Sequence, residues 1–407
     1  MRLVALSIFG LLACGTEPVT HVEDLPGARN EAYRAASAHY GVDQDWLVAI
    51  GFQQGRFESA QQTDTSDTMD TSSDALTADT PVDEPDDSTP DLTSDPLDEA
   101  AALPSWGLMY LTDVQIDRAA TLTGHSPDLL RGDVTANIDG AAAILAEDAH
   151  AMGSLRAATT AFLGVEDDAA TLALDELDTA IATGFDVTTT NAERLALDGT
   201  GANIIADPIS PDEETADADR TAAGHTPPYQ WIASPNFSTR EGYPIRYVVI
   251  HDIEGTMAGA IAVFKSSANQ TSAHYIVRSH DGHIVKMVLE RNNAWHAGHA
   301  WFNRHSIGIE HEGFAHRRAG GGYYTDTLYG ASAALTCAIV HRYNIPVDRK
   351  HIFGHENVPS NLSSHTLCSD ARGIAGLCGG VSHHSDPGKY WDWKKYMKLV
   401  SSCVARI

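Results

Sequence analysis

The chain has 407 residues, which is too many for one ordinary domain and favours two or three. Its longest apolar run, residues 3–13, is too short for a mature membrane span, so the composition excludes polytopic membrane proteins, collagens and coiled coils. The net charge of −28 divides into −33 over residues 1–226 and +5 over residues 227–407, and the latter hold 15 of the 20 His. The overall acidity argues against nucleic acid as a partner, whereas the basic C-terminal part suits an anionic polymer.

The N-terminus has the pattern of an export signal. Arg2 precedes the apolar run, which ends in Leu11-Leu12-Ala13-Cys14. These four residues resemble the lipobox of bacterial lipoproteins, which implies a signal peptide over 1–13, lipidation of Cys14 and a tether over 14–26. Gly15 follows the Cys where an inner-membrane retention signal has Asp. We therefore expect an exported protein anchored in the outer membrane, on the periplasmic side, with plain secretion as the alternative.

Four cysteines remain after the signal: Cys337, Cys368, Cys378 and Cys403. An even number in an exported protein suggests disulfides. We expect Cys368–Cys378 to close a short Gly-rich loop and Cys337–Cys403 to join two predicted helices. A Cys₄ zinc site is the alternative, but the spacings lack the paired C-x₂-C knuckles of such sites.

Two acidic stretches divide the chain. Residues 60–103 contain 13 Asp/Glu and no Lys/Arg, a composition that predicts a disordered insert, and residues 201–226 are predicted to be a linker. Before the linker, Ala/Leu-rich segments with helical period predict helices at Arg29–Tyr40, Gln44–Gly55 and Asn137–Ala151. After it, short strands are predicted at Tyr247–His251, Ala273–Val277, His283–Met287 and Ser306–Glu310. They alternate with helices predicted at Met257–Ser267, Thr327–Tyr343 and Trp391–Val404. This alternation predicts an α/β domain over 227–407, with a central mixed β-sheet flanked by helices.

Three segments of the helical half carry a resemblance. Residues 35–50, Trp106-Gly107-Leu108-Met109 and the Asn137-Ile138 helix resemble, in this order, lysozyme-like lytic transglycosylase domains. The resemblance covers roughly 27–165 and implies a mostly α lysozyme-like domain over 27–200. Where that family has a catalytic Glu followed by Ser, this chain has Gln54-Gly55, and an amide has no proton to give. Glu58 lies four residues further on, but a substitute acid would have to be within hydrogen-bond reach of the glycosidic bond. We therefore expect no muramidase activity. The unit either binds glycan or only supports folding.

The C-terminal half contains a pattern of His residues that is typical of a metal site. A catalytic zinc needs three protein ligands and one open position, and His residues at strand ends or in Gly/Asp/Pro-containing loops are candidates. Three segments qualify, namely those around His251, His355 and 383–388. They lie within six ordered motifs at 247–252, 272–277, 294–298, 306–313, 354–356 and 386–388. Together these motifs resemble the type 2, zinc-dependent N-acetylmuramoyl-L-alanine amidases, whose fold is shared with peptidoglycan recognition proteins.

The resemblance implies a role for each matching residue. His251, His355 and Asp386 would bind Zn²⁺, and Glu310 would orient or deprotonate the attacking water. His384 stands where some members have a Lys two residues before the metal Asp, so an imidazole would stabilise the oxyanion and the rate would depend more on pH.

Other residues of the motifs are expected to support the site or to contact the substrate. His274 is expected to be buried and hydrogen-bonded. Substrate contacts are expected at Trp295, His296 and Asn269; the alternatives are a core position for Trp295 and a buried, hydrogen-bonded role for His296. Glu312 shares the face of Glu310 and is the rival base, whereas His311 should point to the opposite face. Residues 360–382 separate two ligand motifs and are expected to form a disulfide-braced loop near the site.

The sequence therefore predicts a peptidoglycan hydrolase that cleaves the amide between N-acetylmuramic acid and the L-alanine of the stem peptide. Its expected partners are peptidoglycan and, through the lipid anchor, a membrane, and we expect a monomer. A non-catalytic peptidoglycan-binding protein of the same fold is the main alternative. A bifunctional muramidase–amidase is a second one, which Gln54 argues against.

Overall fold

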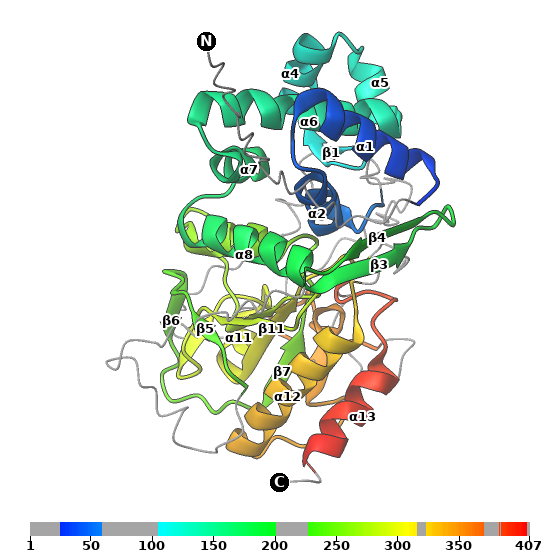
Figure 1. The fold of residues 1–407 in the computed structure, drawn as a ribbon. Helices are drawn as coiled ribbons and strands as arrows, with labels where there is room; N and C mark the ends of the chain where they lie inside the picture. The colour runs from blue at the N-terminus through cyan, green and yellow to red at the C-terminus, as the bar shows by residue number, and fades with distance from the viewer. Residues whose placement is uncertain are drawn as a thin grey trace, which may run out of the picture.

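The computed structural model describes residues 25–58, 105–200, 227–315, 323–369, 382 and 384–404 (Figure 1). The predicted signal peptide, lipidated Cys14, acidic insert and linker lie outside these residues and stay predictions. Among the helices that are described, none is both long and apolar enough to cross a membrane.

The N-terminal part, residues 25–58 and 105–200, is a helical unit with two small hairpins (Figure 1). Its helices are α1 (Ala28–Tyr40), α2 (Gln44–Gly55), α4 (Asp113–Thr123), α5 (Pro127–Gly132), α6 (Val134–Met152), α7 (Leu155–Leu163) and α8 (Asp167–Thr183). Its hairpins pair β1 (Ser105–Trp106) with β2 (Leu111–Thr112), and β3 (Gly184–Thr188) with β4 (Arg194–Asp198). Side-chain caps fix several helix starts, as at α2, where Asp43 accepts a hydrogen bond from the N–H of Trp46 at 2.9 Å. The predicted helices at α1, α2 and α6 are confirmed.

The C-terminal part, residues 227–404, is built on a six-stranded mixed sheet in the order β12-β7-β11-β8-β9-β5. Its strands are β5 (Gln230–Trp231), β7 (Tyr247–Ile250), β8 (Tyr275–Val277), β9 (Ile284–Lys286), β11 (Ser306–His311) and β12 (Ile352–Gly354). The four strands from β12 to β8 are parallel, and β9 runs antiparallel to β8. A separate hairpin pairs β6 (Phe237–Thr239) with β10 (Asn292–Ala294). The predicted mixed sheet and its four strands are confirmed.

One face of this sheet is covered by α12 (Asp326–Tyr343) and α13 (Trp393–Val404), which lie side by side (Figure 1). Ile250 and Ile307 of the sheet share an apolar cluster with Leu335 and Tyr396 of these helices. The predicted Cys337–Cys403 disulfide is present and joins α12 to α13, which excludes a Cys₄ zinc site. The predicted partner of Cys368, Cys378, lies outside the described residues.

The other face of the sheet is covered by α10 (Met257–Lys265), and α8 of the helical unit packs on α10 from outside (Figure 1). Leu172 and Ala173 of α8 belong to the same buried cluster as Ile261 and Phe264 of α10. The short α11 (Ala300–His305) precedes β11, and a 3₁₀ turn, η3 (His355–Asn357), follows β12. The two units therefore share an apolar core at α8 and α10.

Candidate metal centre

The candidate site lies at the carboxyl ends of three adjacent parallel strands, the usual place for a ligand site in an α/β sheet. Register places one residue from each strand in a single row: Ile309 of β11, Ile250 of β7 and Gly354 of β12. The next residues along the chain are Glu310, still in β11, and His251 and His355, directly after β7 and β12, so the sheet brings them together. The strands are short and almost entirely buried, as is usual for parallel strands covered on both faces.

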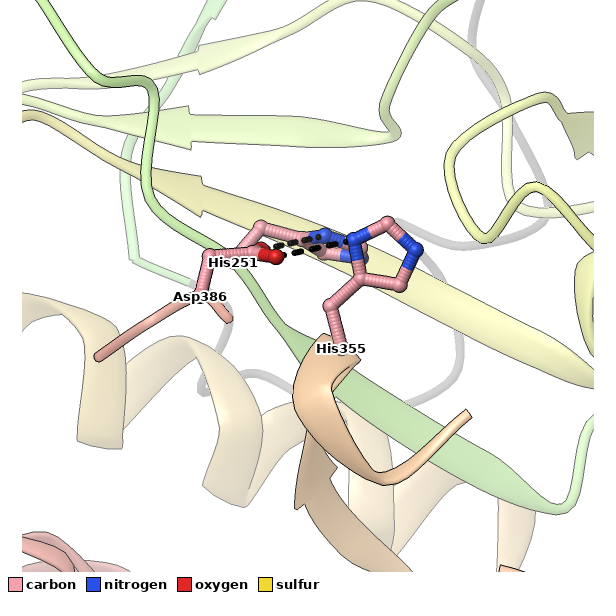
Figure 2. A group of neighbouring side chains, drawn as sticks. All are labelled: His251, His355 and Asp386. Atoms are coloured by element: carbon pink, nitrogen blue, oxygen red, sulfur yellow. Dashed lines mark hydrogen bonds and ion pairs between the residues drawn. The ribbon is translucent and has the colours of Figure 1, made fainter. Parts of the chain in front are cut away.

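A loop before α13 brings the third predicted ligand to the two histidines. Nδ1 of His251 lies 3.1 Å from Oδ2 of Asp386, and Nδ1 of His355 lies 3.0 Å from Oδ1 (Figure 2). The exposed fractions are 1% for each His and 8% for Asp386. Among the described residues these three form the group of His, Cys, Asp and Glu side chains that is close enough to hold one ion.

The donor set and its spacing fit a zinc ion. Two imidazoles and one carboxylate are ligands that catalytic zinc sites use, with a fourth position left to water or substrate. Zinc–ligand bonds of about 2.0–2.1 Å in a tetrahedron place ligand atoms about 3.3 Å apart. The two nitrogen–oxygen distances of 3.1 and 3.0 Å lie close to that spacing.

The protonation states also suit a metal. Burial, reinforced by the nearby His355, lowers the pKa of His251 to about 4, against the opposing effect of Asp386. Burial by itself raises the pKa of Asp386, but His355 and His251 outweigh it and hold that pKa well below its usual range. At neutral pH the site therefore presents a neutral imidazole and a carboxylate, which are the forms that bind metal.

The second nitrogen of His251 is held by another histidine. Nε2 of His251 lies 3.0 Å from Nδ1 of His296, and Nε2 of His296 lies 3.1 Å from Oγ of Ser306. His296 is 3% exposed, and both of its ring nitrogens are engaged in these contacts. This placement agrees with the alternative of a buried, hydrogen-bonded role, in which the ring supports His251 as residues behind a metal ligand commonly do; the substrate contact stays a prediction.

Gly308 of β11 makes room for that ring. A Cβ at this position would lie 2.5 Å from Cγ of His296, far inside normal contact. The imidazole therefore packs directly on the strand backbone, which only a glycine permits. Gly308 also donates its N–H to Nδ1 of His274 at 3.1 Å.

The loop that carries Asp386 is fixed by backbone and side-chain contacts. The N–H of Glu356, next to His355, donates to the carbonyl oxygen of Asp386 at 3.0 Å. The hydroxyl of Tyr324 lies 2.8 Å from the carbonyl oxygen of Pro387 and 3.2 Å from Oδ2 of Asp252. Sequence reasoning missed Tyr324, because a hydrogen bond to a backbone carbonyl 63 residues away leaves no motif.

The two candidate bases on β11 have different surroundings. Glu310 is 1% exposed and stands beside His251 in the register of the sheet. Glu312 accepts hydrogen bonds from the N–H groups of Met257 (3.1 Å) and Ser279 (2.9 Å). Because both of its carboxylate oxygens bind backbone of the sheet unit, Glu312 has a structural role, and Glu310 is the better candidate.

The predictions for two other histidines of the motifs are confirmed. His311 points to the α12 face, with Nδ1 2.7 Å from the carbonyl oxygen of His251 and Nε2 2.6 Å from Oγ of Ser332. His274 is buried, and its Nε2 lies 3.0 Å from Nη2 of Arg240.

His384 lies against one of the candidate ligands. Its ring stacks on that of His355, with 3.5 Å between centroids and 16° between planes. The side chain of His384 is half-buried.

The other two residues predicted to contact the substrate, Trp295 and Asn269, form hydrogen bonds within the sheet unit. Trp295 is half-buried, and its Nε1 donates to Oγ of Ser238 at 3.4 Å. Asn269 donates its side-chain N–H to the carbonyl oxygen of Val263 in α10 at 3.0 Å. Their substrate contacts stay predictions.

In the helical unit, Gln54 is half-buried in the last turn of α2. Glu58 accepts hydrogen bonds from the N–H and hydroxyl of Thr190, at 2.7 and 2.8 Å, so its carboxylate holds the β3–β4 turn. This engagement agrees with the expectation that Glu58 does not replace the missing acid.

Comparison with known proteins places the site in a family context. Residues 241–389, which include all three candidate ligands, match the Amidase_2 family, described as N-acetylmuramoyl-L-alanine amidase. A relative from Achromobacter lyticus, N-acetylmuramoyl-L-alanine amidase A, is 34% identical over 170 residues, which are 42% of this chain and 90% of the relative. The 1,6-anhydro-N-acetylmuramyl-L-alanine amidase AmpD of Haemophilus influenzae is 29% identical over 137 residues, 32% of this chain and 59% of that protein. A solved structure of an AmpD derivative is 25% identical, with a TM-score of 0.31, and covers 42% of this chain and 94% of its own.

Proposed function

The chain belongs to the N-acetylmuramoyl-L-alanine amidase family, and on that basis we propose that it is a zinc-dependent peptidoglycan amidase. Its substrate would be the amide between the lactyl group of N-acetylmuramic acid and the L-alanine of the stem peptide. The observation that carries this proposal is the buried group of His251, His355 and Asp386 at the strand ends.

The proposed chemistry divides between the metal and the chain. When bound, zinc supplies Lewis-acid chemistry: it lowers the pKa of water towards ~7 and polarises a carbonyl oxygen. Glu310 would take the proton of the attacking water and pass it to the leaving amine of L-alanine. His384, stacked on His355, would stabilise the negative oxygen of the tetrahedral intermediate, and His296 would orient His251.

A non-catalytic peptidoglycan-binding protein is the alternative. A protein that only binds peptidoglycan needs neither metal ligands in the protonation states that bind metal nor a carboxylate beside those ligands. This chain has the ionised ligand Asp386 and the neighbouring carboxylate of Glu310. The amidase is therefore the better supported function.

The rest of the chain suggests where the enzyme would act. The lipobox-like residues support export and an anchor at Cys14 in the outer membrane, and the basic sheet unit suits an anionic wall. We propose that residues 27–200 form a lysozyme-like domain without muramidase activity, since Gln54 stands at the acid position and Glu58 is bound to Thr190.

The test uses the chain from residue 15, loaded with zinc and incubated with peptidoglycan. Newly exposed α-amino groups would be labelled and the released N-terminal residue identified. We expect new N-terminal L-alanine, which disappears with a chelator. In Glu310→Gln the rate should fall 10²–10⁴-fold at unchanged zinc stoichiometry, because the general base is lost and the ligands remain.

Zinc binding without release of L-alanine would contradict the amidase and favour the binding protein. New reducing ends would instead reveal glycan cleavage and revive the bifunctional alternative.

A further inference from the structure

The two units meet through charge as well as through apolar packing. Arg56 follows α2 in the left-handed conformation (φ 49°), which turns the chain at the end of the helix. Its side chain is 1% exposed, and its guanidinium carbon lies 4.0 Å from the ring centre of Phe52 and 4.7 Å from that of Tyr323. Its Nη1 donates to the carbonyl oxygen of Phe52 at 2.7 Å. The guanidinium is thus fixed between the helical unit and the sheet unit.

The other guanidinium nitrogen of Arg56 faces two buried glutamate side chains. Nη2 lies 3.4 Å from Oε2 of Glu312 on the sheet side and 3.8 Å from Oε1 of Glu176 on α8. Both glutamates are at most 2% exposed. Burial, followed by the charge of Glu312, raises the pKa of Glu176 to about 8, while Arg278 and Arg56 oppose that rise. A buried carboxylate deprived of its cation is strongly unfavourable, so the carboxylate of Glu312 depends on Arg56.

Glu312 ties together the end of β11. Its N–H donates to the carbonyl oxygen of Val277 at 3.0 Å, and its carboxylate holds the first turn of α10 through Met257 and the loop after β8 through Ser279. Glu310 lies two residues earlier on the same face, about 6.6 Å along the strand. The position of the Glu310 carboxylate is therefore coupled to the position of Glu312.

We propose that Arg56 of the helical unit is a positioning residue for the amidase reaction: by holding Glu312, it fixes the end of β11 that presents Glu310. This inference rests on the proposed function. It assigns the helical unit a part in catalysis that requires neither glycan binding nor glycan cleavage, because the unit supplies the guanidinium that lies 3.4 Å from the Glu312 carboxylate.

The test uses the zinc-loaded chain from residue 15 and the variant Arg56→Met, which keeps side-chain length and removes the charge. We expect kcat to fall at least tenfold with KM within twofold, because a displacement of about 1 Å at a reacting group costs up to 10²-fold. Arg56→Lys, which keeps the charge, should regain most of that loss. Amide exchange of residues 306–312 should be at least tenfold faster in Arg56→Met, with exchange in α13 unchanged.

Asp175→Asn is the matched control. It removes the 3.0 Å ion pair between Asp175 of α8 and Arg278, which crosses the same interface, and it leaves the pair of Arg56 and Glu312 in place. We expect less than a twofold change in kcat and in the exchange of 306–312. If Arg56→Met does not fold, Arg56→Gln carries the same comparison.

Unchanged kcat and unchanged exchange at 306–312 in a folded Arg56 variant would overturn the proposal. So would equal losses in Asp175→Asn, because they would show a general effect of the interface. Failure of the proposed function is distinguishable: the parent chain would then release no L-alanine, while the exchange comparison would still report whether Arg56 fixes β11.

Discussion

Replacing Gly308 by Ala tests whether His296 orients a metal ligand. The added Cβ would lie 2.5 Å from Cγ and 2.7 Å from Nδ1 of His296, whereas carbon contacts settle near 3.5–4.0 Å. The ring must therefore shift by about 1 Å relative to the strand. Such a shift lengthens the 3.0 Å contact with His251 beyond hydrogen-bond range. Loss of a partner behind a ligand typically costs 10–100-fold in metal affinity, so we expect zinc affinity to fall by that factor.

Competition with a chromophoric chelator measures this affinity directly. Gly330→Ala is the control, because Gly330 lies in α12 and a Cβ there meets nothing within 4 Å. The control should bind zinc like the parent chain and be slightly more stable, since Ala is the better helix former. Gly308→Ala should also lose about 1–3 kcal/mol of stability through overpacking. Parent-like zinc affinity in a folded Gly308→Ala would refute the orienting role of His296.

Two further predictions concern the loop of Asp386 and the response to acid. Tyr324→Phe removes the hydroxyl that lies 2.8 Å from the carbonyl oxygen of Pro387. Losing this hydrogen bond costs about 1 kcal/mol, so the zinc affinity should fall about fivefold. A zinc affinity within experimental error of the parent would argue against this contact. Burial lowers the pKa of His251 to about 4 and that of His311 to about 3, so in mild acid the unfolded chain binds protons that the folded chain does not. The free energy of unfolding of the metal-free chain should therefore fall as the pH drops from about 6.5 to 4, by up to about 1.4 kcal/mol per pH unit for each group. Urea unfolding midpoints that do not change over this pH range would contradict the prediction.

Local pattern was enough to predict most of the sheet unit. The β-branched run at β7 and the apolar helical period of α12 determine these elements before any tertiary contact is known. The disulfide between Cys337 and Cys403 could also be predicted, because each Cys lies on a predicted helix. The ligand set was predicted from motifs, which place each residue in a strand end or loop whose position the parallel sheet then fixes.

Contacts between residues far apart in sequence were not predictable in the same way. The sequence left a substrate contact and a buried role open for His296, because its ring nitrogens meet His251 and Ser306 across three elements that no local pattern connects. Glu312 shared the face of Glu310, and alternation along a strand cannot distinguish them. Only their hydrogen-bond partners distinguish the two glutamates. Glu312 accepts hydrogen bonds from Met257 and Ser279, which lie on segments that no sequence motif connects to it.

The shared interface also explains why the helical unit would be kept without an acid at position 54. Removing the unit would expose the apolar face of α10, where Ile261 and Phe264 pack against Leu172 of α8. It would also remove Arg56, leaving Glu312 with backbone donors alone. Both effects destabilise the strand end beside the candidate metal centre. The helical unit therefore has a physical function at β11 whether or not it holds glycan, and the two roles are separable by substitutions at Arg56 and at Gln54.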